Sequence, residues 1–192
     1  MNKIKISPRN SKLGNIPNIS LIPVKDCANC GSCKGSCYAL KAWKQYPAVR
    51  KAWSHNSRMF HKDINNAIDQ VNAWIQDKQP EYFRWNVAGD ILNQEHLDGV
   101  KAIARNNPGT RFLIFTKRHE LTFKAIPDNL SIVLSMFPGM KQTRKGLAKA
   151  WLQDGSETRI PDKALKCAGS CVNCKICFYL NNTDSDVYFD IH

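Results

Sequence analysis

Apolar residues between positions 64 and 75 recur at intervals of three and four, which is the spacing of one buried helix face. The members of this face are Ile64, Ala67, Ile68, Val71, Trp74 and Ile75. The spacing predicts a helix that ends before Pro80. A second helix is predicted around Leu97, Val100, Ile103 and Ala104, and the NNPG turn at 106–109 should end it. Residues 38–53 are also helix-prone, with an interruption at Pro47.

Short apolar runs at 19–24, 82–87, 111–116 and 130–136 are typical of strands, and 187–190 is a possible fifth. Strands that alternate with helices favour a parallel sheet with right-handed crossovers. These strands are too few to close an eight-stranded barrel. We therefore expect an α/β fold with a partial, open (βα) barrel-like parallel sheet. Residues 141–166 are basic, and the stretch 147–152 is helix-prone.

The length of 192 residues suits a single α/β domain spanning 1–192. No apolar run approaches the roughly 20 residues of a membrane span, and the first residues lack the apolar core of an export signal. We therefore expect no membrane partner and a reducing, cytoplasmic location. The oligomeric state is left open by the sequence.

All eight cysteines fall in two runs, one near each end of the chain. The first run, 27–37, has the spacing CxxCxxCxxxC and contains Cys27, Cys30, Cys33 and Cys37. The second run, 167–177, has the spacing CxxxCxxCxxC and contains Cys167, Cys171, Cys174 and Cys177. Two groups of four thiols indicate metal-binding loops, since a tetrahedral ion or a cubane cluster takes four thiolates. Disulfides are disfavoured, because neighbours two or three residues apart form strained bridges.

The spacing of the first run favours an iron–sulfur cluster of the 4Fe-4S type, one or two per chain. Tyr38 stands where ferredoxins usually have proline after the last cysteine. Structural zinc is the alternative, although a zinc ribbon more often has two CxxC pairs and would leave cysteines to spare. The spacing does not decide whether each run holds its own metal or the two runs share one.

The formal net charge of +12 makes a nucleic acid or nucleotide a plausible partner. Residues 38–53 support this reading, because they place Lys41, Lys44, Arg50 and Lys51 among Trp43, Tyr46 and Trp53. Bases could stack on such aromatic rings while the cations contact phosphates. An amphipathic helix with inward aromatics and solvated cations is the more common alternative.

Candidate ligand-binding residues follow the predicted strands, since open α/β sheets bind ligands at the carboxyl ends of their strands. Ala88, Gly89 and Asp90 lie at one such end, where Gly89 could let the backbone approach a ligand and Asp90 could receive an ammonium or hydroxyl group. An ordinary turn with Asp90 capping the next helix is equally compatible. The segment 116–119 (TKRH) could contact a phosphate or carboxylate, or be a solvated loop.

Two histidines, His55 and His61, are further candidates for metal binding or catalysis. They precede the predicted helix at 64–75. A surface position is the more common outcome for isolated histidines.

The strand, the loop containing CxxxCY, the helix and then VAGDILNQEHLDGVKAIARNNPGTRFLIFTK resemble the front half of a radical S-adenosylmethionine (SAM) enzyme. That family carries CxxxCxxC after its first strand and a Gly-Gly-Glu-like turn after its second. Cys33 and Cys37 match the first two motif cysteines, but Leu40 occupies the third position. The resemblance implies reductive cleavage of SAM at a cluster with an open iron, with residues 88–90 holding the cofactor. A complete CxxxCxxC occurs only in the second run.

A broader resemblance covers most of the chain. SKLGNIPNISLIP, the CxxxCYALK segment, the strand that ends in TKR and the late cysteine run are similar to phage-encoded proteins of the gene product 88 type. This resemblance implies a bacteriophage origin, a small radical-SAM-like fold and a location in the cytoplasm of the bacterial host. The competing class is a non-enzymatic nucleic-acid-binding or host-interaction module with structural zinc or closed clusters.

Overall fold

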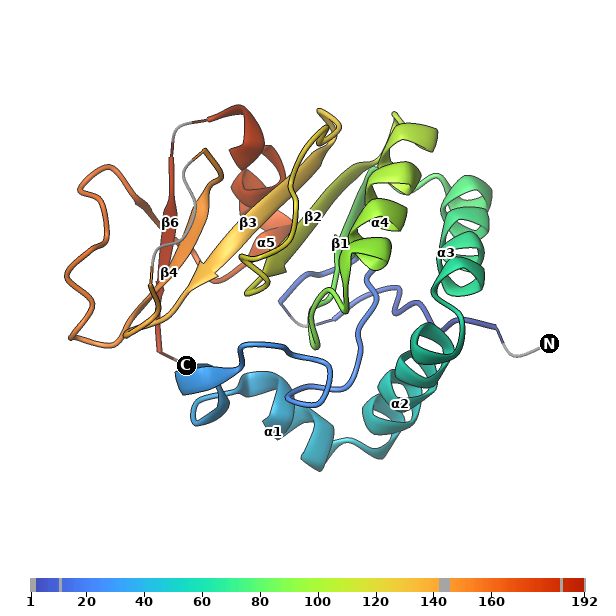
Figure 1. Cartoon of the computed structure of the whole chain (residues 1–192), viewed down its shortest axis with the longest axis horizontal. Helices are drawn as coiled ribbons and strands as arrows, with labels where there is room; N and C mark the ends of the chain where they lie inside the picture. The colour runs from blue at the N-terminus through green and yellow to red at the C-terminus, as the bar shows by residue number, and fades with distance from the viewer. Residues whose placement is uncertain (1–2, 11, 142–145, 184, 192) are drawn as a thin grey trace.

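A six-stranded, fully parallel sheet forms the centre of the computed structural model, which describes residues 3–10, 12–141, 146–183 and 185–191 (Figure 1). The strands are β1 (Tyr82–Trp85), β2 (Arg111–Thr116), β3 (Leu130–Met136), β4 (Lys149–Gln153), β5 (Leu165–Lys166) and β6 (Val187–Asp190). They lie in the order β1-β2-β3-β4-β6-β5. Every neighbouring pair is parallel, and the sheet does not close on itself. The α/β class and the open parallel sheet are thus confirmed.

Most of the helices precede β1 or connect β1 to β2. The four longer ones are α1 (Tyr38–Gln45), α2 (Pro47–Lys62), α3 (Ile64–Lys78) and α4 (Gln94–Asn106). Pro47 occupies the first turn of α2, and the side chains of Asp63 and Asn93 cap α3 and α4 by accepting backbone N–H groups. Three short segments lie at the cysteine runs, namely η1 (Gly31–Lys34), α5 (Cys171–Cys174) and η2 (Ile176–Asn182). No helix in the described part of the chain is long and apolar enough to cross a membrane.

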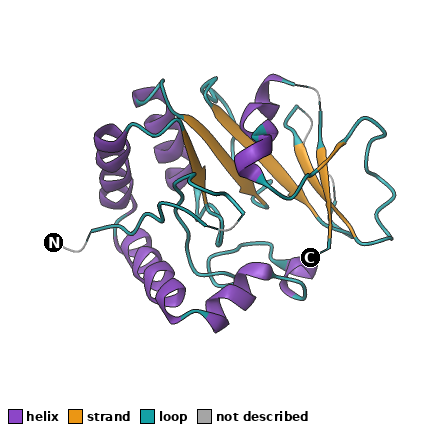
Figure 2. Cartoon of the chain, turned by 180° about the vertical axis from the view of Figure 1, so that it is seen from behind, coloured by secondary structure: helices purple, strands orange, loops and turns teal. Residues whose placement is uncertain are grey.

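Each face of the sheet packs against its own layer. On one face, α3 and α4 bury Val71, Ile75 and Leu97 in a core that also contains Phe83 and Phe112. Figure 2 shows η2 and α5 in front of the opposite face. There, Leu113 and Val133 pack with Phe178 and Leu180 of η2 and with Leu13 from the N-terminal segment. Strands covered on both faces read as continuous apolar runs, which explains why β2 and β3 are visible in the sequence.

One helix prediction and two strand predictions need correction. The stretch 147–152, predicted as helix-prone, contains most of β4, whose first four residues are buried between β3 and β6. Tertiary burial here overrides the helix propensity of alanine, lysine and leucine. The predicted strand 82–87 ends at Trp85, because Asn86 has a left-handed backbone with φ 46°. Residues 142–145 of the predicted basic stretch lie outside the described part.

Residues 19–22 of the predicted strand 19–24 form an irregular extended segment beside β1, whereas Pro23 and Val24 lie in a turn. Asn18 forms a parallel bridge with Arg84, and the Leu21 N–H donates to the Ala88 carbonyl over 2.9 Å. Gly89 makes the close approach possible. Its φ is +75°, and a Cβ at this position would lie 2.6 Å from the Cβ of Leu21.

We predict that Gly89→Ala destabilises the protein by about 2–4 kcal/mol, because it adds left-handed backbone strain to a steric overlap with Leu21. Urea unfolding followed by circular dichroism measures this loss. Gly109→Ala is the matched control, since a Cβ there meets no atom within 4 Å. Equal stability of the two variants would show that the 19–24 segment does not pack against residue 89 as described.

Candidate metal centres

The first cysteine run lies at the carboxyl edge of the sheet, next to β1 and β2. The extended segment beside β1 carries the chain to this edge, and Asp26 then fixes the turn into the run. One carboxylate oxygen of Asp26 accepts the Ile22 N–H over 2.8 Å, and the Asp26 carbonyl accepts the Asp90 N–H. In Figure 1 the loop and α1 lie below the strands, on the side where β1, β2 and β3 end.

Cys37 occupies the N-cap of α1. Its Sγ accepts the Leu40 N–H over 3.4 Å, and the neighbouring Cys33 thiol also donates to it. The hydrogen bond from Cys33, together with the N–H groups of Leu40 and Ala39, lowers the pKa of Cys37 to about 6. The same hydrogen bond and burial raise the pKa of Cys33. Cys37 is therefore a thiolate at neutral pH, which is the form that binds metal.

A buried cation, Lys117, lies beside the first run. Its ammonium group is 3.5 Å from Oδ2 of Asp90, whose side chain is fully buried. Burial alone would lower the pKa of Lys117, but Asp90 and the thiols of Cys27, Cys33 and Cys30 raise it overall. In turn, burial raises the pKa of Cys27 to about 11, while Lys117 opposes the rise. Lys117 thus offsets part of the charge that thiolates would bring to this edge.

Asp90 holds the end of β1 to the end of β2. Its carboxylate accepts the Ile91 N–H (2.7 Å), the Thr116 hydroxyl (2.6 Å) and the Lys117 N–H (2.9 Å). The cap of α4 is Asn93, so Asp90 does not cap that helix as one reading of the sequence expected. Binding of a cofactor by Ala88, Gly89 and Asp90 stays a prediction. The protein itself already uses both Asp90 oxygens, and Gly89 approaches Leu21.

The segment 116–119 is mostly directed into the protein. Arg118 donates to the carbonyls of Ile91 and Leu92 and pairs with Glu120. His119 is buried, with Nε2 3.1 Å from the Ser135 carbonyl oxygen. These partners argue against the reading of this segment as a solvated loop.

The two candidate histidines have different environments. His55 lies 2.9 Å from the Lys3 carbonyl and links α2 to the N-terminal segment. His61 is 52% exposed, yet its Nε2 lies 2.8 Å from Oδ1 of the fully buried Asp26. Since Asp26 and His61 are 35 residues apart, no local pattern in the sequence reveals this pair.

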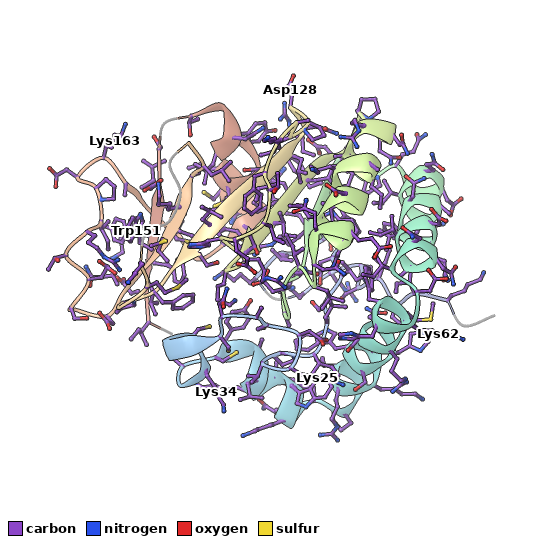
Figure 3. All side chains as sticks on the ribbon, viewed as in Figure 1. Lys25, Lys34, Lys62, Asp128, Trp151 and Lys163 are labelled. Atoms are coloured by element: carbon purple, nitrogen blue, oxygen red, sulfur yellow. The ribbon has the colours of Figure 1, made fainter. Side chains whose placement is uncertain are left out.

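A pocket of about 630 Å³ adjoins the first run. Its walls include Lys25, Asp26, Cys27, His61, Lys62 and Arg118. In Figure 3, Lys25 and Lys62 are labelled on the side of the molecule that carries the cysteine loop and α2. The volume is in the range of small-molecule sites. A ligand in this pocket would lie against both the His61–Asp26 pair and the first cysteine run.

The second cysteine run packs on the face of the sheet opposite α3 and α4. Backbone N–H groups of Cys167 and Cys171 donate to the Tyr188 carbonyl (2.7 Å) and the Lys12 carbonyl (3.1 Å). All four cysteines of this run line one small pocket, together with Leu113 and Phe178. Burial raises the pKa of Cys177 to about 12 and also raises that of Cys171.

A second cation, Arg84, acts on this run. Its guanidinium lies 4.1 Å from the centre of the Phe115 ring, and its Nε donates to the Trp85 carbonyl. The positive charge of Arg84 lowers the pKa of both Cys171 and Cys177, against the larger effect of burial. Neither Lys117 nor Arg84 was singled out by the sequence as a partner of the cysteines, because a cation inside a strand or at its end has no distinctive spacing.

All eight cysteines are free thiols. As the side chains stand, no group of three or more His, Cys, Asp or Glu residues in the described ranges is arranged to hold a metal ion. The donor set nevertheless fits a metal chemically, since each run supplies four partly exposed thiols, and a buried cation interacts with three thiols of each run. The predicted metal ligands thus remain predictions, and binding would require the thiols of each loop to draw together.

A comparison with protein-family models finds one match, described as Gene product 88, over residues 2–160. The matched region contains the first cysteine run and ends before the second, so the similarity predicted for the late run is not part of this match. No curated protein and no solved structure matches the chain.

We predict that Cys37 is the most readily alkylated thiol of the metal-free, reduced protein. Its modification by iodoacetamide should rise with pH through about 6, whereas Cys27 and Cys177 should stay slow below pH 9. Peptide mass spectrometry across pH 5–9 measures each site. Cys33→Ala is the control, because losing its hydrogen bond should move the Cys37 midpoint upward. An unchanged midpoint in that variant would contradict the described contact.

Proposed function

We propose that this chain, which belongs to the gene product 88 family, is an iron–sulfur protein whose first cysteine run holds a four-iron cluster beside a small-molecule pocket. One observation carries the proposal: four free thiols, a buried lysine and a pocket of about 630 Å³ meet at the carboxyl edge of a parallel sheet. A bound 4Fe-4S cluster would supply one-electron chemistry at this edge.

The protein's own residues would prepare this edge for a cluster and a ligand. Lys117 supplies a positive charge beside the thiols, and Cys37 supplies a thiolate at neutral pH. Oδ1 of Asp26 accepts a hydrogen bond from Nε2 of His61, which holds the imidazole at the wall of the pocket. Cys27 lines the same pocket as His61, so a ligand there could contact both groups.

The radical-SAM-like reading is a finer part of the proposal. The extended segment beside β1 supports it, because the first cysteine run follows the carboxyl end of that segment and precedes the helices. Leu40 replaces the third motif cysteine, so Cys27 or Cys30 would have to complete a three-thiolate set. SAM requires an iron without a protein ligand. If all four cysteines of the run bind, the protein is instead a redox-active or cluster-stabilised protein.

A second candidate function is supported by the exposed side of α1 and α2. Lys41, Lys44, Arg50, Lys51 and the ring of Tyr46 are all exposed there. Trp43 and Trp53 instead stack on one another, with ring centres 6.4 Å apart, and are only partly exposed. This arrangement favours a non-enzymatic module that binds a nucleic acid through its phosphates, with zinc or closed clusters at the cysteines.

We predict that protein purified without oxygen is brown, absorbs near 400 nm and contains iron and acid-labile sulfide in equal amounts. Elemental analysis and the absorption spectrum measure this. The substitution Cys33→Ala should lower the iron content. Cys27→Ala tests whether Cys27 is the ligand that completes the three-thiolate set. Colourless protein with stoichiometric zinc would contradict the iron–sulfur assignment. If SAM binds, adding it to the reduced protein should change the electron paramagnetic resonance spectrum of the cluster.

For the nucleic-acid alternative, we predict salt-sensitive binding to DNA or RNA that weakens on replacing Lys41, Lys44, Arg50 and Lys51 with glutamine. Each lost phosphate contact should reduce the slope of log affinity against log salt by about 0.7–0.9. Fluorescence anisotropy with labelled oligonucleotides measures this slope. The matched control replaces Lys78, Lys124, Lys163 and Lys166, which are exposed and lie outside α1 and α2. An equal loss in both variants would contradict a site on α1 and α2.

A further inference from the structure

The division of the eight thiols between metal centres is not evident from their spacing, but their surroundings separate them. The first run meets the sheet at the ends of β1 and β2, near Asp90 and Lys117. The second run meets the sheet on its face, near Leu113 of β2. Figure 1 shows the first loop below the strands, and Figure 2 shows α5 in front of the face.

We propose that the thiols sort by run into two separate centres, each with its own buried cation, Lys117 for the first run and Arg84 for the second. This inference rests on the proposed function and adds to it the ligand sets and the counter-charges. The first centre would draw its ligands from Cys27, Cys30, Cys33 and Cys37, and the second would draw its ligands from Cys167, Cys171, Cys174 and Cys177.

The electrostatic partners of the thiols support this division. Cys27 and Cys33 interact with Lys117 and with other thiols of the first run. Cys171 and Cys177 interact with Arg84 and with other thiols of the second run. Four thiolates around a four-iron core leave a net negative charge in a partly buried site, and each cation would offset part of it.

The enclosure of the second run gives independent, geometric support. All four of its cysteines line one pocket, whose apolar wall includes Leu113 and Phe178. The same core contains Val87 and Phe115, and the guanidinium of Arg84 stacks on Phe115. The second run therefore has four thiols, an apolar shell and a cation without any contribution from the first run.

Two further side chains, Tyr38 and Arg84, adjoin the thiols. The Tyr38 hydroxyl donates to the Val87 carbonyl over 2.5 Å. Tyr38 directly follows Cys37 in the sequence. Arg84 interacts with Tyr38 and also with Cys171, Cys177 and Cys167. The thiols that interact with Arg84 most strongly all belong to the second run.

The division is tested by counting metal in reconstituted full-length variants. Wild-type protein should hold about eight irons per chain, the content of two four-iron clusters. The double variants Cys33→Ser/Cys37→Ser and Cys171→Ser/Cys174→Ser should each keep half of the iron. Loss of all iron from either variant, with native circular dichroism, would overturn the division. If the wild-type protein binds two zinc ions and each double variant loses one of them, the division holds but the iron–sulfur assignment is contradicted. A wild-type protein without metal would overturn both.

The assignment of the cations is tested by redox titration followed by electron paramagnetic resonance, in each double-cysteine background. Arg84→Gln should lower the reduction potential of the second centre only, since a nearby positive charge favours the reduced cluster. Lys117→Gln should lower that of the first centre only. Arg111→Gln is the matched control, because Arg111 stacks on Tyr179 in the same sheet. If Arg84→Gln changed the reduction potential of both centres, or of neither, the pairing of each cation with its cysteine run would be overturned.

Discussion

The buried carboxylate of Asp90 is the contact on which the arrangement of the carboxyl edge depends. It accepts hydrogen bonds from the chain after β1 and from the end of β2, and it lies opposite the ammonium group of Lys117. Its own N–H donates to Asp26, just before the first cysteine. A buried carboxylate is tolerated only when it is fully paired, so this contact holds strand ends, cysteine loop and cation in one arrangement. The edge is therefore organised without any metal.

Much of the fold follows from sequence periodicity, because the buried face of α3 and the apolar runs of β2 and β3 are local patterns. The stretch 147–152 is helix-prone because its alanines, lysine and leucines favour helices, but it forms most of β4 because β3 and β6 flank it. The position of β6 between β4 and β5 could not be predicted either, because strand order depends on which edge remains open. A four-residue strand carries little information about its neighbours.

The residues of the candidate site also differ in how far the sequence alone reveals them. The cysteines are evident from their spacing, whereas their partners are not. Arg84 in β1 and Lys117 just after β2 have no distinctive pattern in the sequence, and only folding buries them beside thiols. Asp90 was identified as important for its place after a strand, but its role in the structure is to hold the protein together. His61 of α2 gains its significance from Asp26, which lies in the turn before the first cysteine run. Local patterns thus reveal the donors, and only the tertiary structure reveals their electrostatic environment.

β6 is the last of the described strands to be synthesised, which has a consequence for folding on the ribosome. β5 pairs only with β6 among the described strands, and the Cys167 N–H donates to Tyr188 in β6. A growing chain on the ribosome can therefore assemble β1 to β4 and the first cysteine loop well before residue 167 has a strand to hold it. The backbone around the first cysteine run can therefore take its place before the backbone around the second run has a partner strand.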